Sequence, residues 1–198
     1  MRKGKLVRHI PNSLTIANMI LGFSAIILII QTDLPRKEFI VLGLVMLGGI
    51  ADLLDGRIAR KFGVCSDIGK QLDSFADIIT FGVAPVSLLN YLCRHSILTI
   101  IISSIFIIAG AYRLARHNLN PRSKHLMGLP ISIAAAILLV YCIKLPQWAV
   151  NQHPAVCMAA TSLILILLSA MMLSKREIKK IPIIMPVVRI CRKIFYQK

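Results

Sequence analysis

Long apolar stretches alternate with short polar segments along the whole chain, and 57% of the residues are hydrophobic. Six of these stretches approach the ~20 residues that a membrane-spanning helix needs. They lie at about 11–31, 38–56, 72–92, 97–115, 128–145 and 154–173. The pattern predicts an all-α membrane protein whose six transmembrane helices are joined by short loops. We expect residues 1–174 to form one transmembrane domain and residues 175–198 to form a basic tail beside the membrane.

The acidic residues are concentrated where the second and third apolar stretches meet. The chain has only eight Asp and Glu residues, and five of them fall within residues 52–77. Asp52 and Asp55 are three residues apart and Asp73 and Asp77 are four apart, so each pair shares one face of a helix. Asp67 lies outside these registers, and we expect a solvated loop acid or a helix cap there.

Carboxylates at the edge of a hydrocarbon layer are costly unless something compensates their charge. If the two helices pack antiparallel, the four carboxylates outside the loop converge on one point. Four negative charges are balanced by two divalent cations, and all-oxygen ligands favour a hard ion such as Mg²⁺ or Mn²⁺. The sequence therefore predicts a two-metal site at one end of the second and third helices.

The distribution of charge along the chain distinguishes a nucleic-acid-binding protein from a membrane protein. A charge of +16 is compatible with nucleic-acid binding, but 20 of the 24 lysines and arginines fall on one side of the predicted six-helix topology. This bias is the positive-inside pattern of a membrane protein. It predicts that both termini and the acidic window face the cytoplasm, and that the basic tail lies on an anionic leaflet. No nucleic-acid partner is expected.

Five further polar or small residues are candidates by position alone. Thr15 and Asn18 lie on one stripe of the first helix, where they either pack against a neighbouring helix or reach into the acidic site. Gly56 either leaves room for a flat ligand or serves close packing. Arg113 and Arg116 share a face at the end of the fourth helix. They either extend to lipid headgroups or form an anion pocket opposite the acidic cluster.

The helix ends and bends are predicted from the prolines and from the loop composition. We expect the first helix to begin near Pro11, which is a favourable first-turn residue. The segment KFGVCSDIGKQL, residues 61–72, is interpreted as an interfacial loop punctuated by two glycines. Pro85 is expected to kink the third helix. The dispersed cysteines and histidines predict neither a disulfide framework nor a histidine metal site.

A family resemblance rests on seven positions of the acidic window. The pattern D-G-x2-A-R-x8-G-x3-D-x3-D resembles the CDP-alcohol phosphotransferase signature, and Asp52 matches the additional upstream Asp of its longer form. Within that family, LDSFADIITFGVAP and RLARHN are similar to segments of the integral-membrane phosphatidylserine synthases. The signature positions are Asp55, Gly56, Ala59, Arg60, Gly69, Asp73 and Asp77.

The resemblance implies an activity, a fold and partners. The implied reaction moves a phosphatidyl group from CDP-diacylglycerol to the hydroxyl of L-serine and releases CMP. The implied fold has six transmembrane helices, forms a homodimer in the cell membrane and opens its catalytic cavity on the cytoplasmic side. Glycerol 3-phosphate or an inositol phosphate remains an alternative acceptor, and a small cation transporter is an alternative of another class.

The resemblance also implies roles for the matched residues. Asp52, Asp55, Asp73 and Asp77 hold the metal ions, and Asp77 matches the general base. The residues that line the CDP pocket are Gly56, Ala59, Arg60 and Gly69, with Thr15 and Asn18 as further candidates from the first helix. Serine carries a carboxylate that inositol lacks. For that carboxylate Arg113 is our first candidate and Arg116 our second.

Overall fold

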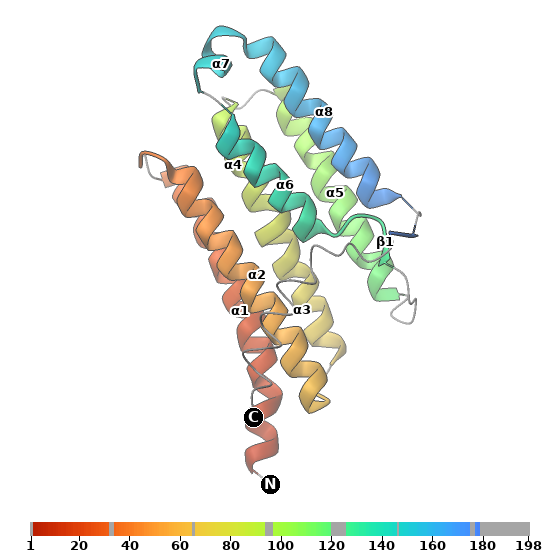
Figure 1. Cartoon of the computed structure of the whole chain (residues 1–198). Coiled ribbons are helices and arrows are strands. Elements are labelled where there is room, and N and C mark those ends of the chain that lie inside the picture. Colours follow the sequence, from red (N-terminus) through yellow and green to blue (C-terminus); the bar gives the residue numbers. More distant parts are fainter. Residues whose placement is uncertain are drawn as a thin grey trace, which may run out of the picture.

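The structure, a computed structural model of the chain, describes residues 2–31, 34–64, 66–93, 97–119, 126–145, 147–174 and 177–178. This part is helical apart from one antiparallel pair of two-residue strands (Figure 1). The predicted basic tail, 175–198, lies outside the described residues except for 177–178. The elements are α1 (Arg2–Gln31), α2 (Lys37–Phe62), α3 (Asp67–Asp77), η1 (Ile78–Val83), α4 (Ala84–Leu92), α5 (Ile97–Leu119), β1 (Leu126–Met127), α6 (Ile131–Lys144), α7 (Gln147–Gln152), α8 (Pro154–Leu173) and β2 (Glu177–Ile178).

Five helical segments of the described chain are long and apolar enough to cross a membrane. Four are α1 from Ile10 onward, α2, α5 and α8, and the fifth is the continuous run α3–η1–α4. The sixth predicted span forms α6, which has 14 residues. At about 1.5 Å per residue, α6 is about 21 Å long. It is therefore shorter than a hydrocarbon core of about 30 Å.

The helices pack as two pairs on either side of a central run. α1 packs along α2, α5 packs along α8, and α3–η1–α4 lies between these pairs (Figure 1). α6 packs against α4 and η1. The buried core includes Phe106, Leu88, Leu89, Ile131, Leu138 and Leu165.

Large apolar side chains also cover the outside of the bundle. Ile20, Phe23, Met46 and Ile108 are each more than half exposed. On a soluble protein such a surface would favour aggregation, whereas lipid solvates it at no cost. The exposed apolar surface therefore agrees with the predicted membrane protein.

The prediction for the start of the first helix was wrong. α1 begins at Arg2, and Pro11 lies inside the helix. A proline removes one backbone donor from a helix interior. The Pro11 carbonyl still has a hydrogen-bonding partner, because Thr15 Oγ1 lies 3.0 Å from it.

The prediction of a loop over residues 61–72 was also wrong, because a short turn joins two helices there. α2 ends at Phe62, and Gly63 adopts φ 63°, where its N–H caps the carbonyls of Ala59 and Arg60. Ser66 then caps α3 by accepting a hydrogen bond from the Gly69 N–H at 3.0 Å. A left-handed glycine and an N-cap serine are the ordinary signals for a helix end and a helix start.

Pro85 is accommodated by a local change of helix type. The segment η1 is a π-helix, and the Ala84 N–H bonds the Ile79 carbonyl at its end. Because Pro85 lacks an N–H, the wider π-helical turn redistributes the neighbouring hydrogen bonds. π-helical turns occur frequently at functional sites, and this one begins directly after Asp77.

Gly128 explains why α6 starts later than predicted. Its φ of 72° is unfavourable for an L side chain, and a Cβ there would overlap the Met172 carbonyl of α8. The adjacent Leu129 N–H donates to the Met171 carbonyl at 3.1 Å. These contacts hold residues 128–129 outside helical geometry, so the helix begins only at Ile131.

Candidate active site

The acidic residues of α2 and α3 come together as the spacing predicted. Carboxylate oxygens of Asp52, Asp55 and Asp73 all lie within 4.8 Å of one another. Asp55 is 4% exposed, so this charge is withdrawn from solvent. The antiparallel approach of the end of α2 to the start of the α3–η1–α4 run produces this geometry.

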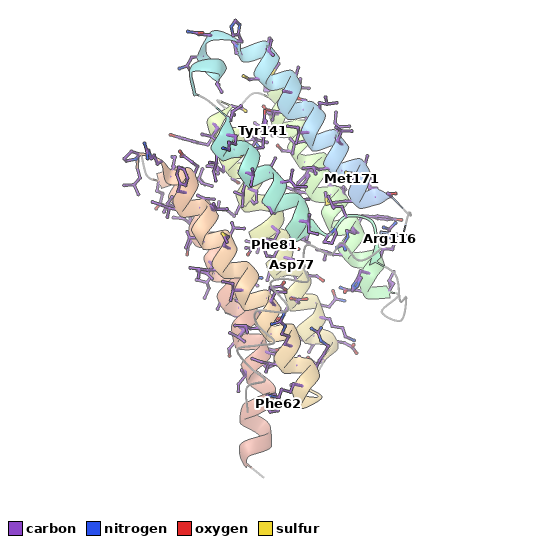
Figure 2. All side chains as sticks on the ribbon, in the orientation of Figure 1. Phe62, Asp77, Phe81, Arg116, Tyr141 and Met171 are labelled. Carbon is purple, nitrogen blue, oxygen red and sulfur yellow. The ribbon has the colours of Figure 1, made fainter. Side chains whose placement is uncertain are left out.

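Asp77 lies beside these three carboxylates and interacts electrostatically with each of them. Figure 2 places it within the bundle, next to Phe81 of η1. One carboxylate oxygen of Asp77 and one of Asp73 are buried without a hydrogen-bond donor among the described residues. Buried carboxylate oxygens that lack protein donors are suitable ligands for a hard cation. The cluster could therefore hold a divalent metal ion.

Asp67 is separate from this cluster. It is the first residue of α3, its side chain is 97% exposed, and it pairs with Lys70 at 3.0 Å. The prediction of a solvated acid outside the site is confirmed, although Ser66 rather than Asp67 provides the cap.

Thr15 of α1 reaches the acidic cluster. Its Oγ1 lies 2.5 Å from Asp55 Oδ2, and both side chains are buried. A hydroxyl that donates to a carboxylate makes a short, charge-assisted hydrogen bond and fixes the carboxylate's rotamer. α1 is therefore a wall of the site rather than only a packing partner.

Asn18 also lies on α1, about one turn beyond Thr15 along the chain. It is fully buried, and its amide nitrogen and oxygen have no hydrogen-bond partner among the described residues. Its side chain packs on Gly48, where a Cβ would come within 2.6 Å of Asn18 Oδ1. The backbone carbonyl of Asn18 accepts from Thr80 Oγ1 at 3.0 Å.

Gly56, a small residue of the signature, leaves room for the side chain of Arg60. The guanidinium of Arg60 lies over Gly56, where a Cβ would be 3.4 Å from Nη1. Arg60 also interacts electrostatically with Asp52, Asp55 and Asp73. Ala59 is only half-buried.

Gly69 permits a close contact between α3 and α1. A Cβ at this position would lie 3.0 Å from Ser66 Oγ and 3.2 Å from Asn12 Oδ1. Asn12 was not among the predicted site residues. It lies three residues before Thr15, and this spacing on one helical face was the available signal.

The two arginines of α5 have different surroundings. Arg113 is 6% exposed, interacts electrostatically with Asp77, and has an Nε without a hydrogen-bond partner among the described residues. Arg116 instead donates to the carbonyls of Leu173 and Ser174, each at 3.3 Å, and so caps the end of α8. Figure 2 shows Arg116 at the side of the bundle, away from Asp77.

The end of α5 also brings two residues to α3 that sequence reasoning missed. His117 interacts electrostatically with Asp73, and Asn118 Nδ2 donates to Ser74 Oγ at 2.8 Å. His117 lies four residues after Arg113, which places both on one helical face. That spacing could have identified it.

The assembled site combines a carboxylate cluster with nearby cationic groups. Arg60 and Arg113 lie on different elements, and both interact electrostatically with acids of the cluster. A bound cation at the carboxylates would add positive charge where a phosphate group could approach. The arrangement is therefore suited to binding and cleaving a phosphate ester or anhydride.

Comparison with known proteins agrees with this chemistry. The profile of the CDP-alcohol phosphatidyltransferase family matches residues 8–174. The CDP-diacylglycerol--serine O-phosphatidyltransferase of Methanocaldococcus jannaschii is 36% identical over 173 residues, covering 87% of this chain and 75% of that protein.

Proteins of the same name from two other organisms are similarly close. The Bacillus subtilis protein is 33% identical over 137 residues, covering 68% of this chain and 75% of its own length. The Saccharomyces cerevisiae protein is 32% identical over 151 residues, covering 69% of this chain and 55% of its own length. The match spans nearly the whole membrane domain, so this chain belongs to the CDP-alcohol phosphatidyltransferase family.

Proposed function

We propose that this protein transfers the phosphatidyl group of CDP-diacylglycerol to the hydroxyl group of L-serine and releases CMP. The observation that carries the proposal is the cluster of Asp52, Asp55 and Asp73, with Asp77 beside it. This cluster lies in a chain whose relatives from an archaeon, a bacterium and a yeast are named for that reaction.

Two divalent cations, Mg²⁺ or Mn²⁺, are the proposed cofactors. Asp52, Asp55, Asp73 and Asp77 would hold them, because four carboxylates bring the four negative charges that two such ions balance. When bound, the ions supply positive charge to the diphosphate oxygens on which negative charge develops.

The proposed CDP pocket lies next to these carboxylates. Gly56, Ala59 and Gly69 would line this pocket, and the Arg60 guanidinium, which lies over Gly56, would pair with a phosphate oxygen of the nucleotide. Thr15 orients Asp55, and Asn18 presents a buried amide one turn deeper in the bundle.

Asp77 is the proposed general base. A serine hydroxyl is a weak nucleophile, so a carboxylate within hydrogen-bond reach should accept its proton as the oxygen attacks phosphorus. The new phosphorus–oxygen bond forms as the bond to the CMP oxygen breaks, and CMP leaves with that electron pair. Ser74, the serine next to Asp73, is hydrogen-bonded to the Lys70 carbonyl and to Asn118 rather than to a histidine or carboxylate base, which favours direct displacement over a covalent enzyme intermediate.

Arg113 is the proposed partner of the serine carboxylate. It is buried, it has a free Nε donor among the described residues, and it faces the charge of Asp77. Arg116 is the second candidate, and its bonds to α8 make it the weaker one.

The placement of the enzyme in the cell is also a proposal. We place both termini and the acidic site on the cytoplasmic side of the cell membrane, because the basic residues concentrate there in a six-span topology. In this arrangement residues 1–174 form the catalytic domain, α6 completes the sixth span, and the tail 175–198 binds anionic lipids. The working unit is a homodimer.

An acceptor panel tests the proposal. The purified full-length protein receives CDP-diacylglycerol with L-serine, glycerol 3-phosphate, inositol 1-phosphate or inositol, in the presence of Mg²⁺, Mn²⁺ or EDTA. We expect phosphatidylserine and CMP in equal amounts with serine and a cation, and no product with EDTA. Mass spectrometry of the lipid product and chromatography of the nucleotide provide the readout.

Two results would contradict the proposal. A phosphatidyl product with another alcohol, and none with serine, would keep the family chemistry but replace the acceptor. Turnover that persists in EDTA after metal removal would instead exclude the metal-assisted mechanism. An Asp67→Asn variant, altered outside the cluster, is the matched control for effects of lost surface charge.

A further inference from the structure

Among the described residues, a direct side-chain hydrogen bond joins the end of α5 to α3. Asn118 Nδ2 donates to Ser74 Oγ at 2.8 Å, and Ser74 Oγ in turn donates to the Lys70 carbonyl of its own helix at 3.1 Å. Because the Ser74 hydroxyl donates its proton within α3, its oxygen accepts the hydrogen bond from Asn118. The bond has a defined direction and a defined pair of rotamers.

This bond lies in register with the charged groups of the site. Ser74 directly follows Asp73, and Asn118 lies five residues beyond Arg113, which interacts electrostatically with Asp77. Moving along α5 from Arg113 to Asn118 corresponds to moving back along α3 from Asp77 to Ser74. The two helices therefore run antiparallel. Arg113 and Asp77, the groups assigned to the alcohol acceptor, face each other about one turn from the bond.

The rest of the contact between these helices gives little other support. α5 packs more extensively against α8 and against η1 than against α3 itself. His117 interacts electrostatically with Asp73, but it makes no hydrogen bond to α3 among the described contacts. At the level of Ser74, the direct link between the described side chains of α3 and α5 is therefore the Asn118–Ser74 hydrogen bond.

We propose that the Asn118–Ser74 hydrogen bond sets the distance between Arg113 and Asp77, and that Asn118 is a positioning residue for the alcohol acceptor. The inference rests on the proposed function, because that function assigns Arg113 and Asp77 to the acceptor. Neither Asn118 nor Ser74 needs to touch the substrate. Their bond holds α5 so that a carboxylate-binding group and a proton acceptor can contact one small molecule together.

This role has a specific kinetic consequence. Loss of the bond lets α5 move relative to α3, so the acceptor no longer contacts both groups at once. We expect the KM for serine to rise about fivefold, the factor that corresponds to one neutral hydrogen bond. The KM for CDP-diacylglycerol should stay unchanged, because its proposed binding groups lie on α1, α2 and α3 rather than on α5.

Single and double variants test the proposal. Ser74→Ala and Asn118→Leu each remove the bond, and the double variant removes it once, so its effect should equal that of either single variant. Ser74→Thr keeps the hydroxyl and should restore the wild-type KM. Ser104→Ala is the matched control, because Ser104 also lies on α5 but donates only within its helix in the described contacts, to the Ile100 carbonyl at 3.0 Å.

The outcomes separate this proposal from the proposed function. The identity of the wild-type lipid product tests the function, and the KM of whichever acceptor is used tests the role of Asn118. Additive effects in the double variant would overturn the proposal, as would equal changes in both KM values or no change in either. If Asn118→Leu fails to fold, Ser74→Ala removes the same bond without added bulk and carries the test alone.

Discussion

At the scale of single residues, burial distinguishes the aspartates of the site from the aspartate on the surface. Asp55 is buried and contacts the Thr15 hydroxyl, whereas Asp67 is almost fully exposed and pairs with Lys70. Burial of several carboxylates together is unfavourable without a compensating charge. The chain therefore maintains an unfavourable arrangement at one place, which is typical of a functional site.

Thr15 provides a test of how the acidic cluster is oriented. Thr15→Val keeps the shape of the side chain but removes the hydrogen bond to Asp55. A hydrogen bond to a charged group contributes about 1.5–3 kcal/mol. We expect the apparent affinity for Mn²⁺ to fall about tenfold or more, measured as the Mn²⁺ concentration that gives half-maximal turnover.

Ser24→Ala is the control for this change, because Ser24 is exposed on the same helix. It should leave the Mn²⁺ dependence unaltered. If Thr15→Val also leaves it unaltered, Thr15 does not orient a metal ligand.

At the scale of elements, glycines determine how closely α1, α2 and η1 approach. A Cβ at Gly22 would overlap Thr80, and a Cβ at Gly48 would press on both Asn18 and Thr80. Thr80 lies in the π-helical turn that directly follows Asp77. The packing of three helices is thus linked to the position of the proposed general base.

Alanine substitutions test this packing. Gly22→Ala forces a methyl group against the backbone of Thr80, and overpacking of this kind costs about 1–3 kcal/mol. We expect a lower thermal unfolding temperature in detergent and a loss of activity. Gly43→Ala is the matched control, because no atom lies within 4 Å of a Cβ there.

Gly43→Ala should be neutral or slightly stabilising, since alanine favours a helix by about 1 kcal/mol over glycine. Equal unfolding temperatures for the Gly22→Ala and Gly43→Ala proteins would show that close approach at Gly22 is not required.

A buried lysine joins the helices at the opposite end of α2. Lys37 is 3% exposed, its Nζ donates to the Ile29 carbonyl at 3.0 Å, and it lies 3.4 Å from the centroid of the Tyr91 ring. These contacts connect α2 with α1 and α4. We expect Lys37→Met to destabilise the protein by about 1–3 kcal/mol, measured by thermal unfolding, without a change in either substrate KM at low temperature.

Lys144→Met is the control for this variant, because Lys144 is exposed at the end of α6. A Lys37→Met protein that unfolds at the same temperature as the Lys144→Met protein would exclude a structural role for the Lys37 contacts.

At the scale of the whole molecule, periodicity and spacing predicted most of the architecture. The runs of apolar residues predicted the membrane helices, and the three- and four-residue spacings of the aspartates predicted their convergence. The α6 boundary was missed because it depends on the φ of Gly128 and on its contact with α8. A contact with an element 44 residues later in the chain leaves no local pattern in the sequence.

The role of Arg116 was missed for a similar reason. Arg113 and Arg116 share a helical face, and spacing alone could not decide which one meets the acids and which one caps α8. The Ser74–Asn118 bond likewise joins positions that are 44 residues apart. Sequence patterns thus predicted the helices and the convergence of Asp52, Asp55 and Asp73, whereas contacts between distant segments required the structure.

The membrane topology that we propose from the distribution of lysine and arginine can be measured. In an active variant without its native cysteines, Leu34→Cys and Lys61→Cys mark the two ends of α2. We expect a membrane-impermeant maleimide to label Leu34→Cys in intact cells and to label Lys61→Cys only after permeabilisation. The reverse pattern would place the acidic site on the outside and contradict the positive-inside assignment.

The central claim is that four clustered carboxylates hold the metal ions that make transfer to serine possible. The most direct measurement is Mn²⁺-dependent formation of phosphatidylserine by purified Asp52→Asn, Asp55→Asn, Asp73→Asn and Asp77→Asn proteins, compared with Asp67→Asn. Each change in the cluster should lower the rate by about 100-fold or more, as expected for the loss of an electrostatic or proton-accepting group, while Asp67→Asn keeps the wild-type rate. Wild-type rates in the four cluster variants, or a loss as large in Asp67→Asn, would contradict the account.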